Sequence, residues 1–275
     1  MKTHSVFRPA SGLACRSAFS AASRAGLVLL VAACAPRPAA DEDASGSAAA
    51  TDLTPAQELV ARSVAFHDPD GVWGSRSISM SWVGTDGEGG ERVAVDLEFG
   101  ADERDFALAG RYRGSAIEYE TTADGWSASV DGVAQADLPD ADRERMRLHR
   151  EDGMFWRSYY GFLAGLPMKI SDPGSHLDHD VIETAFMDRE VHAVRVTYDP
   201  DTGGDTWYFY FDPATAQLVG CRFYHEESAN DGEYITFEGL TGDSGLRLPR
   251  LRGWYVNADG RHLGTDEVRT VRVGP

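Results

Sequence analysis

The fold is decided most clearly by residues 207–212, which read WYFYFD. Successive side chains of an extended strand point to opposite faces of a sheet. Trp207, Phe209 and Phe211 therefore share one face, and the two tyrosines between them share the other. Asp212-Pro213 follows directly and is typical of a turn. The stretch predicts a strand of an antiparallel sheet that has a strongly apolar inner face.

The same period of two extends outward from this stretch in both directions. Short turn-like segments that contain Gly, Asp or Pro separate the alternating stretches, which is typical of antiparallel strands. We therefore expect about eleven strands in one twisted antiparallel sheet or open barrel. Besides 207–212, the predicted strands are 77–83, 93–99, 115–120, 126–131, 181–186, 191–199, 218–227, 233–240, 246–256 and 266–273.

Helical patterns precede and interrupt these strands. Thr54 can cap a first helix of about 12 residues, with Pro55 at its first position and Gln57 completing a capping box. The segment 139–150 is charged and predicts a second helix. The segment 154–167 is strongly apolar, carries five aromatic residues at helical spacing and ends in Gly165 and Pro167. It predicts a central aromatic helix.

The N-terminus has the features of a targeting signal. Residues 1–33 hold four basic residues and no acidic one, and the apolar run 25–33 ends at Cys34. The segment Val31-Ala32-Ala33-Cys34 looks like a bacterial lipobox, a motif in which the cysteine is acylated and the peptide is cut before it. An ordinary secretory peptide cut nearby is the alternative. We therefore expect a signal peptide at 1–33, a lipidated Cys34 with a flexible tether over 34–53, and one domain over 54–275.

Composition excludes several classes of function. The chain has 275 residues and a net charge of −18, and removal of the four basic residues of 1–33 leaves −22. Such a charge argues against nucleic-acid binding, which needs clustered basic residues. Cys15 lies in the signal and Cys34 would carry lipid, so Cys221 has no disulfide partner. Sequence templates of hydrolases, metalloproteases and P-loop enzymes are absent, and we expect no catalysis and no cofactor.

The order of these elements resembles a known group of proteins. It comprises the lipobox, the tether, the first helix, strands, an aromatic insert ending in Gly165-Leu166-Pro167, and the later segments 207–213, 234–237 and 246–249. The chain is similar to an uncharacterised family of bacterial lipoproteins, which in turn resembles the half-barrels that carry and receive lipoproteins during outer-membrane sorting. The resemblance implies a mainly β (α+β) fold, an open antiparallel half-barrel wrapped around the two helices. It also implies an apolar cavity that holds acyl chains or other hydrophobic groups.

The aromatic residues on the predicted inner faces are the candidate lining of that cavity, although the same residues could equally pack as ordinary core. They are Trp82, Phe99, Trp126, Phe155, Trp156, Tyr159, Phe162, Trp207, Phe209 and Phe211. His176, Asp178 and His179 form a weak metal-like cluster, which is better interpreted as a solvated loop.

These observations favour a lipid-anchored lipoprotein on the periplasmic face of the bacterial envelope, held at the outer membrane by Cys34. Its half-barrel would bind or carry a hydrophobic ligand, so the expected partners are a lipid, an acyl chain or another lipoprotein, with contact to the membrane through the N-terminal anchor alone. Two alternatives remain. One is a structural or protein-interaction lipoprotein with a filled core, and the other is an enzyme of unrecognised type.

Overall fold

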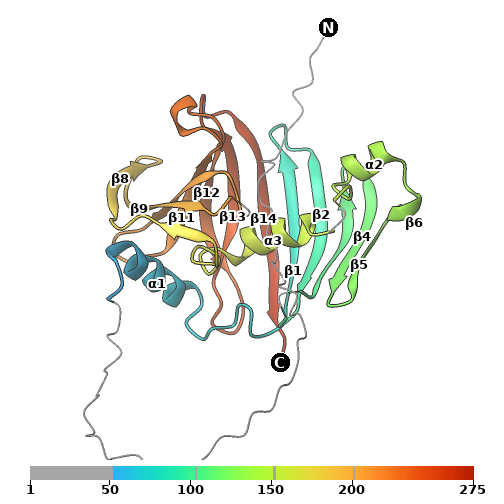
Figure 1. Ribbon diagram of the computed structural model, residues 1–275, viewed down its shortest axis with the longest axis horizontal. Coiled ribbons are helices and arrows are strands. Elements are labelled where there is room, and N and C mark those ends of the chain that lie inside the picture. The colour runs from blue at the N-terminus through green and yellow to red at the C-terminus, as the bar shows by residue number, and fades with distance from the viewer. Residues whose placement is uncertain (1–51, 103, 151–152, 201) are drawn as a thin grey trace, which may run out of the picture.

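One open antiparallel sheet dominates the structure, a computed structural model that describes residues 52–102, 104–150, 153–200 and 202–275. In these residues the sheet has 14 strands (Figure 1). The signal segment, Cys34 and the tether up to residue 51 lie outside the described residues, so the expectations for them stay predictions.

The first half of the sheet runs in chain order from its centre to one edge. All neighbours in this half are antiparallel and are joined by short turns. Its strands are β1 (Ile78–Asp86), β2 (Glu91–Phe99), β3 (Phe106–Tyr112), β4 (Ser115–Thr122), β5 (Gly125–Val130) and β6 (Val133–Ala134).

The second half begins beside β1 with the last strand of the chain and runs backwards to the other edge. Its strands are β14 (His262–Val273), β13 (Leu248–Val256), β12 (Glu233–Thr241), β11 (Leu218–Tyr224), β10 (Thr206–Phe211) and β9 (Arg189–Tyr198). The outer side of β9 pairs with β7 (Ser175–Leu177) near one end and with β8 (Ile182–Phe186) near the other. The β1–β14 pair joins the two halves, with Met80 opposite Val271.

This architecture confirms the predicted mainly β, open antiparallel fold, but about eleven strands were expected. The three strands without a counterpart in that prediction are β3, β6 and β7. Strands β6 and β7 have only 2 and 3 residues, too few to show a period. In β3 the outward positions Ala107 and Ala109 are apolar like the inward ones, which blurs the alternation on which the prediction relied.

Three α-helices accompany the sheet in the described residues: α1 (Pro55–His67), α2 (Asp140–Arg145) and α3 (Phe155–Gly165). The predicted capping box of α1 is present, because Thr54 and Gln57 hydrogen-bond each other's backbone amides. Helix α2 is shorter than predicted; Met146 and Leu148, just beyond its end, are buried. No described helix combines the length and hydrophobicity needed to cross a bilayer.

The main core lies on the inner face of the sheet, beneath the helices. It contains inward residues of both halves, such as Leu97 of β2 and Phe209 of β10, together with the buried sides of α1 and α3. A smaller cluster lies on the outer face around Phe186, Tyr210 and Tyr234. Gly220 lies under the Phe186 ring, which a Cβ at that position would displace.

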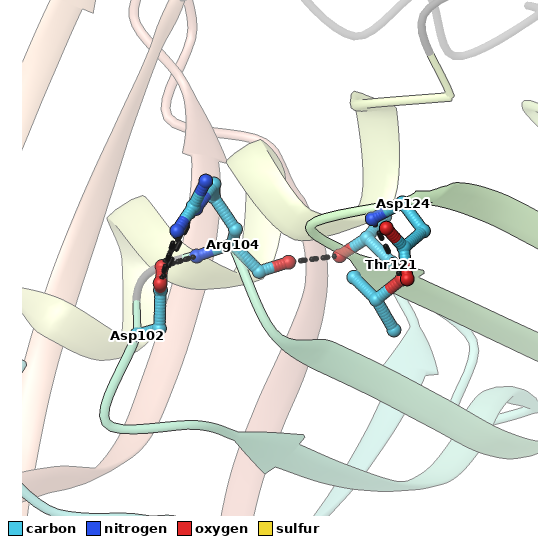
Figure 2. A network of polar contacts seen from close by, with 5 residues as sticks. Asp102, Arg104, Thr121 and Asp124 are labelled. Atoms are coloured by element: carbon cyan, nitrogen blue, oxygen red, sulfur yellow. Dashed lines mark hydrogen bonds and ion pairs between the residues drawn. The ribbon is translucent and has the colours of Figure 1, made fainter.

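The turns between strands are held by local polar contacts, of which the β2–β3 turn is an example (Figure 2). The exposed Arg104 guanidinium pairs with Asp102, and its backbone carbonyl accepts a hydrogen bond of 2.8 Å from the Thr121 hydroxyl of β4. The hydrogen bonds from Arg104 keep the pKa of Asp102 low. The turn is thereby tied to the neighbouring strand rather than left projecting.

Candidate functional site

Helix α3 runs across the inner face of the sheet, over the central strands (Figure 1). Its buried side carries Trp156, Tyr160 and Leu163. The Trp156 ring lies 4.8 Å from that of Tyr112 on β3, and the Tyr160 ring lies 5.2 Å from that of Trp82 on β1. The helix therefore contacts both β3 and β1, which have β2 between them in the sheet.

Specific contacts hold both ends of α3 against neighbouring residues. At the N-terminal end the Tyr119 hydroxyl donates to the Gly153 carbonyl, and the Trp126 ring occupies the place where a Cβ of Gly153 would lie. At the C-terminal end a Cβ of Gly165 would lie 2.6 Å from the Trp73 ring. The two glycines that flank the helix thus allow a tryptophan to pack directly on the backbone.

A second side of α3 remains partly accessible. Phe155, Tyr159 and Phe162 are only half-buried, although they pack against the main core. Phe155 stacks on Tyr159 at 5.9 Å, and Phe162 meets Trp207 of β10 edge to face at 5.1 Å. The helix therefore presents apolar aromatic surface beyond what its own packing against the sheet buries.

All ten candidate aromatic residues belong to the main core or pack against it. Trp82, Trp156, Trp207, Phe209 and Phe211 are buried. The other five are partly exposed and lie at the margins of the core: Phe99, Trp126, Phe155, Tyr159 and Phe162. The structure thus brings the ten residues into one continuous cluster, and the cavity that they were predicted to line stays a prediction.

A buried row of polar side chains crosses the same inner face, and the sequence interpretation did not include it. Asp266 of β14 is fully buried, accepts a hydrogen bond of 2.9 Å from the Trp254 indole and pairs with Arg92 of β2 at 2.7 Å. Gly84 of β1 lies between the two charged residues, and a Cβ there would collide with the Asp266 carboxylate. The missing side chain at Gly84 therefore lets the ion pair form across the intervening strand.

Arg252 of β13 extends this row on the other side of Asp266, which it faces in the register of β13 and β14. It is fully buried. Its guanidinium donates 2.7 Å to the Pro249 carbonyl and 3.4 Å to the Leu163 carbonyl in the last turn of α3. The helical partner of that carbonyl would be the amide of Pro167, which has no N–H, so Arg252 supplies the missing donor.

Aromatic rings surround the Arg252 guanidinium on its remaining sides. Its carbon Cζ lies 4.6 Å from the Trp82 ring and 5.8 Å from the Phe237 ring, within the range of cation–π attraction. Burial lowers the pKa of Arg252 to about 10, so the group stays positively charged at neutral pH. Burial raises the pKa of Asp266, against the opposing effect of Arg92.

The alternation of the strands contains a signal for these residues. Arg252 lies two residues before the buried Trp254, and Asp266 lies two residues before the buried Val268, so each charge shares the inward face with its apolar neighbour. A charged residue at an inward position is the exception that marks a buried polar contact. The pairing across β1 could not be inferred without the strand order.

Two further ionisable groups are removed from water, His67 fully and Glu233 in part. His67 closes α1: its Nε2 accepts from the Leu218 amide at 3.1 Å, so Nδ1 carries the proton and donates 2.5 Å to the Arg247 carbonyl. Burial lowers the pKa of His67 to about 4. Burial raises the pKa of Glu233, at the start of β12, to about 7.

The weak metal candidates do not converge. His176 Nε2 lies 2.6 Å from Asp199, His179 Nδ1 lies 2.7 Å from Asp180, and Asp178 lies 3.5 Å from Arg195. Each of the three therefore has a separate partner. Across the residues that the structure describes, no three metal-ligating side chains gather in one place.

Comparison with known proteins gives a family match and several structural likenesses. A model of a family of unknown function (DUF6503) matches residues 135–269, which begin after β6 and end within β14. No curated protein matches the sequence.

Solved structures of similar fold include three bacterial proteins. A LolA superfamily protein from Nitrosomonas europaea has a TM-score of 0.48 and 10% identity, over 82% of this chain and 95% of that one. A domain described as an outer membrane lipoprotein-sorting protein, from Vibrio parahaemolyticus, has a TM-score of 0.46 and 14% identity, over 79% and 90%. A DUF1329 family protein from Desulfovibrio piger has a TM-score of 0.44 and 10% identity, over 80% and 94%. These neighbours are of the kind that the sequence resemblance named, and the matched family is an uncharacterised one.

Proposed function

We propose that this protein binds a hydrophobic group on the inner face of its open sheet, at the aromatic surface that α3 shares with β10. The observation that carries the proposal is the half-buried side of α3, where Phe155, Tyr159 and Phe162 remain partly exposed beside Trp207. An apolar surface that the fold leaves partly open favours a ligand or a partner, because exposed apolar patches are otherwise kept small.

The geometry of the sheet supports the same proposal. The two edges, β6 on one side and β7 and β8 on the other, do not pair with each other. A closed barrel would seal its interior, whereas an open sheet leaves a side through which a chain-like group can reach the inner face. An acyl chain gains about 0.8 kcal/mol for each methylene group that it buries there.

We also propose that the protein is anchored in the bacterial envelope through an acylated Cys34, with the outer membrane as its destination. The support is the basic segment and apolar run that precede this cysteine, together with Ala35 in the position where an inner-membrane retention signal would place Asp. Stable anchoring needs two or more acyl chains, which modification of this kind supplies.

Two experiments test these proposals. Native mass spectrometry of the purified protein should detect a co-purified hydrophobic molecule, and the amount should fall in Phe162→Ala. Replacing the exposed Met187 by alanine is the matched control, because this side chain is apolar but lies in the β8–β9 turn. Fractionation of cells that express Cys34→Ala should move the protein from membranes to the soluble fraction. A variant that stays on the membrane contradicts the anchor.

A purely structural or protein-interaction role is the second candidate, and the burial of the core favours it. Trp82, Phe209 and Phe211 are almost fully enclosed, as expected of side chains that fill an interior. In that case the protein would carry no hydrophobic molecule, and Phe162→Ala would change stability without changing the mass spectrum. An enzymatic role would instead require polar side chains to converge on a substrate-sized space.

A further inference from the structure

An acidic residue lies on the inner face at the end of the aromatic surface. Glu233 is the first residue of β12, and the inward alternation of this strand continues through the core residues Ile235 and Phe237. In the sheet Glu233 stands opposite Phe223 of β11, which in turn stands opposite Trp207 of β10. Glu233 therefore continues the inward row that Trp207 and Phe223 form.

This row connects Glu233 to the half-buried side of α3. The Phe223 ring stacks on the Trp207 ring at 4.8 Å, and the Phe162 ring meets Trp207 at 5.1 Å. The charge of Glu233 also acts on the Tyr159 hydroxyl of the same helix. Phe162, Tyr159 and Glu233 are each partly exposed, and the two rings between them are buried. A chain that lies over the exposed parts of this surface therefore covers the Glu233 carboxyl group as well.

The Glu233 carboxyl group has basic neighbours but no partner. His225 just after β11, Arg261 just before β14 and Arg92 of β2 are close enough for their charges to act on it. Among the described residues, however, no hydrogen bond or ion pair reaches this carboxyl group. A carboxylate that is partly removed from water and has no partner loses stabilisation of its charge. Burial accordingly raises the pKa of Glu233 to about 7.

The charged neighbours of Glu233 have other partners. The ion pairs are His225 with Asp205 at 2.7 Å, Arg92 with Asp266 at 2.7 Å and Arg261 with Asp259 at 3.9 Å. The two arginines keep their charge at any pH that the protein meets. Tyr159 keeps its proton near neutral pH, because burial raises the pKa of its hydroxyl. Glu233 is therefore the group on this surface whose own charge changes without a partner to oppose the change.

We propose that Glu233 is the proton-dependent contact of the hydrophobic site, and that a bound chain covers its carboxyl group in the uncharged form. This inference rests on the proposed function and adds the regulation of that site. Covering a carboxylate with an apolar chain removes its remaining water and supplies no partner, which costs far more than covering the protonated group. Binding therefore takes up a proton wherever free Glu233 is ionised. The ligand binds most tightly below pH 7, and its affinity falls as the pH rises.

The test measures the affinity for an uncharged chain at two pH values. The methyl ester of the fluorescent fatty acid cis-parinaric acid has no group that titrates, so any pH dependence belongs to the protein. The full chain with Cys34→Ala, stripped of lipid, is titrated with the ester at pH 6 and at pH 8, and circular dichroism checks that it stays folded. With a pKa of about 7 in the free protein, proton uptake predicts a dissociation constant about tenfold larger at pH 8.

Glu233→Gln should abolish this difference and bind the ester at pH 8 about as tightly as the unaltered protein does at pH 6, because glutamine is uncharged at both. Glu238→Gln is the matched control. Glu238 lies on the same strand, but it is exposed and follows the inward Phe237 directly, so it belongs to the other face. The pH dependence should persist in this control.

His225 is distinguished from Glu233 by the sign of its effect. A histidine is charged at low pH and neutral at high pH. If the chain covered a protonated His225, the ester would therefore bind more tightly at pH 8 than at pH 6, which is the reverse of the expected result.

Each outcome separates the two proposals. If the ester binds at neither pH, the proposed function is wrong. If it binds equally at both, or more tightly at pH 8, the proposed function stands and the role of Glu233 is overturned, as it also is if the difference survives in Glu233→Gln. Should that variant fail to fold, calorimetry on the protein with Glu233 decides the matter. Titrations at pH 8 in two buffers of different ionisation enthalpy should show uptake of nearly one proton for each ester bound, and uptake of none contradicts the inference.

Discussion

Replacing Trp156 or Phe162 by alanine, one at a time, should show that the buried side of α3 stabilises the fold and that its half-buried side binds the ligand. Trp156 is buried, its ring lies 4.8 Å from Tyr112 and 5.7 Å from Tyr160, and its indole donates 3.1 Å to the Met146 carbonyl. Truncating such a tryptophan costs roughly 3–5 kcal/mol, including the cavity that it leaves. Phe162 is half-buried, so its truncation should cost only about 1–2 kcal/mol.

Thermal unfolding followed by circular dichroism measures these costs. For a domain of this size each kcal/mol lowers Tm by about 2–4 °C, so Trp156→Ala should lower Tm by roughly 6–20 °C and Phe162→Ala by a few degrees. Binding of the fluorescent fatty acid cis-parinaric acid should rank the two variants the other way. Phe162→Ala should weaken this binding by about tenfold or more, and Trp156→Ala should weaken it less.

Two results would contradict these roles of Trp156 and Phe162. A loss of less than about 1 kcal/mol in Trp156→Ala would mean that this ring is not part of a close-packed core. Unchanged ligand binding in Phe162→Ala, with the protein folded, would mean that the exposed side of α3 does not touch the ligand. Trp156→Phe should lie between the extremes in stability and bind normally, because it keeps most of the apolar contact.

The remaining predictions concern buried polar groups. His67 has a pKa of about 4 in the folded protein and 6.5 in the unfolded chain, so neutral His67 stabilises the fold above pH 6.5 by about 3 kcal/mol, and this stabilisation is lost as the pH falls through 4. The free energy of unfolding measured in urea should therefore fall between pH 7 and pH 4, and His67→Gln should remove this part of the decrease. Glu233 has the opposite sign, because its pKa is raised from 4.5 to about 7: its protonated form is favoured by folding, and stability is lost as the pH rises from 4.5 through 7. Glu233→Gln should therefore stabilise the protein at pH 8 by roughly 2–3 kcal/mol and have little effect at pH 4, and equal effects at the two pH values would contradict the assignment. Gly84→Ala should push the Asp266 carboxylate away from Arg92 and cost about 3 kcal/mol or more in chemical denaturation, whereas a neutral result would mean that the pair does not need the space above this glycine.

The sequence predicted the features that depend on periodicity. The alternation around Phe209 and the capping box at Thr54 depend on near neighbours in the chain, and both appear in the structure. The aromatic helix was also expected, and Trp156 faces the sheet as predicted, whereas Phe155 is on a more exposed side.

The features that escaped prediction depend on which strands become neighbours. Arg92 and Asp266 are 174 residues apart, and they meet because the last strand inserts beside β1. In the sequence, Gly165 was interpreted only as part of the end of the aromatic helix. The structure adds a second reason for this glycine, since the Trp73 ring occupies the space of its Cβ. Local patterns carry no information about such distant partners.

The short strands at the two margins of the sheet have a consequence for how copies of the protein behave when crowded together. Strand β6 offers 2 residues for pairing, and the opposite margin offers the 3 residues of β7 and the 5 of β8. Since exposed strand margins are templates for pairing with another chain, brevity limits how many backbone hydrogen bonds a second copy could add. An open sheet of this size thereby avoids growing into fibres without having to close on itself.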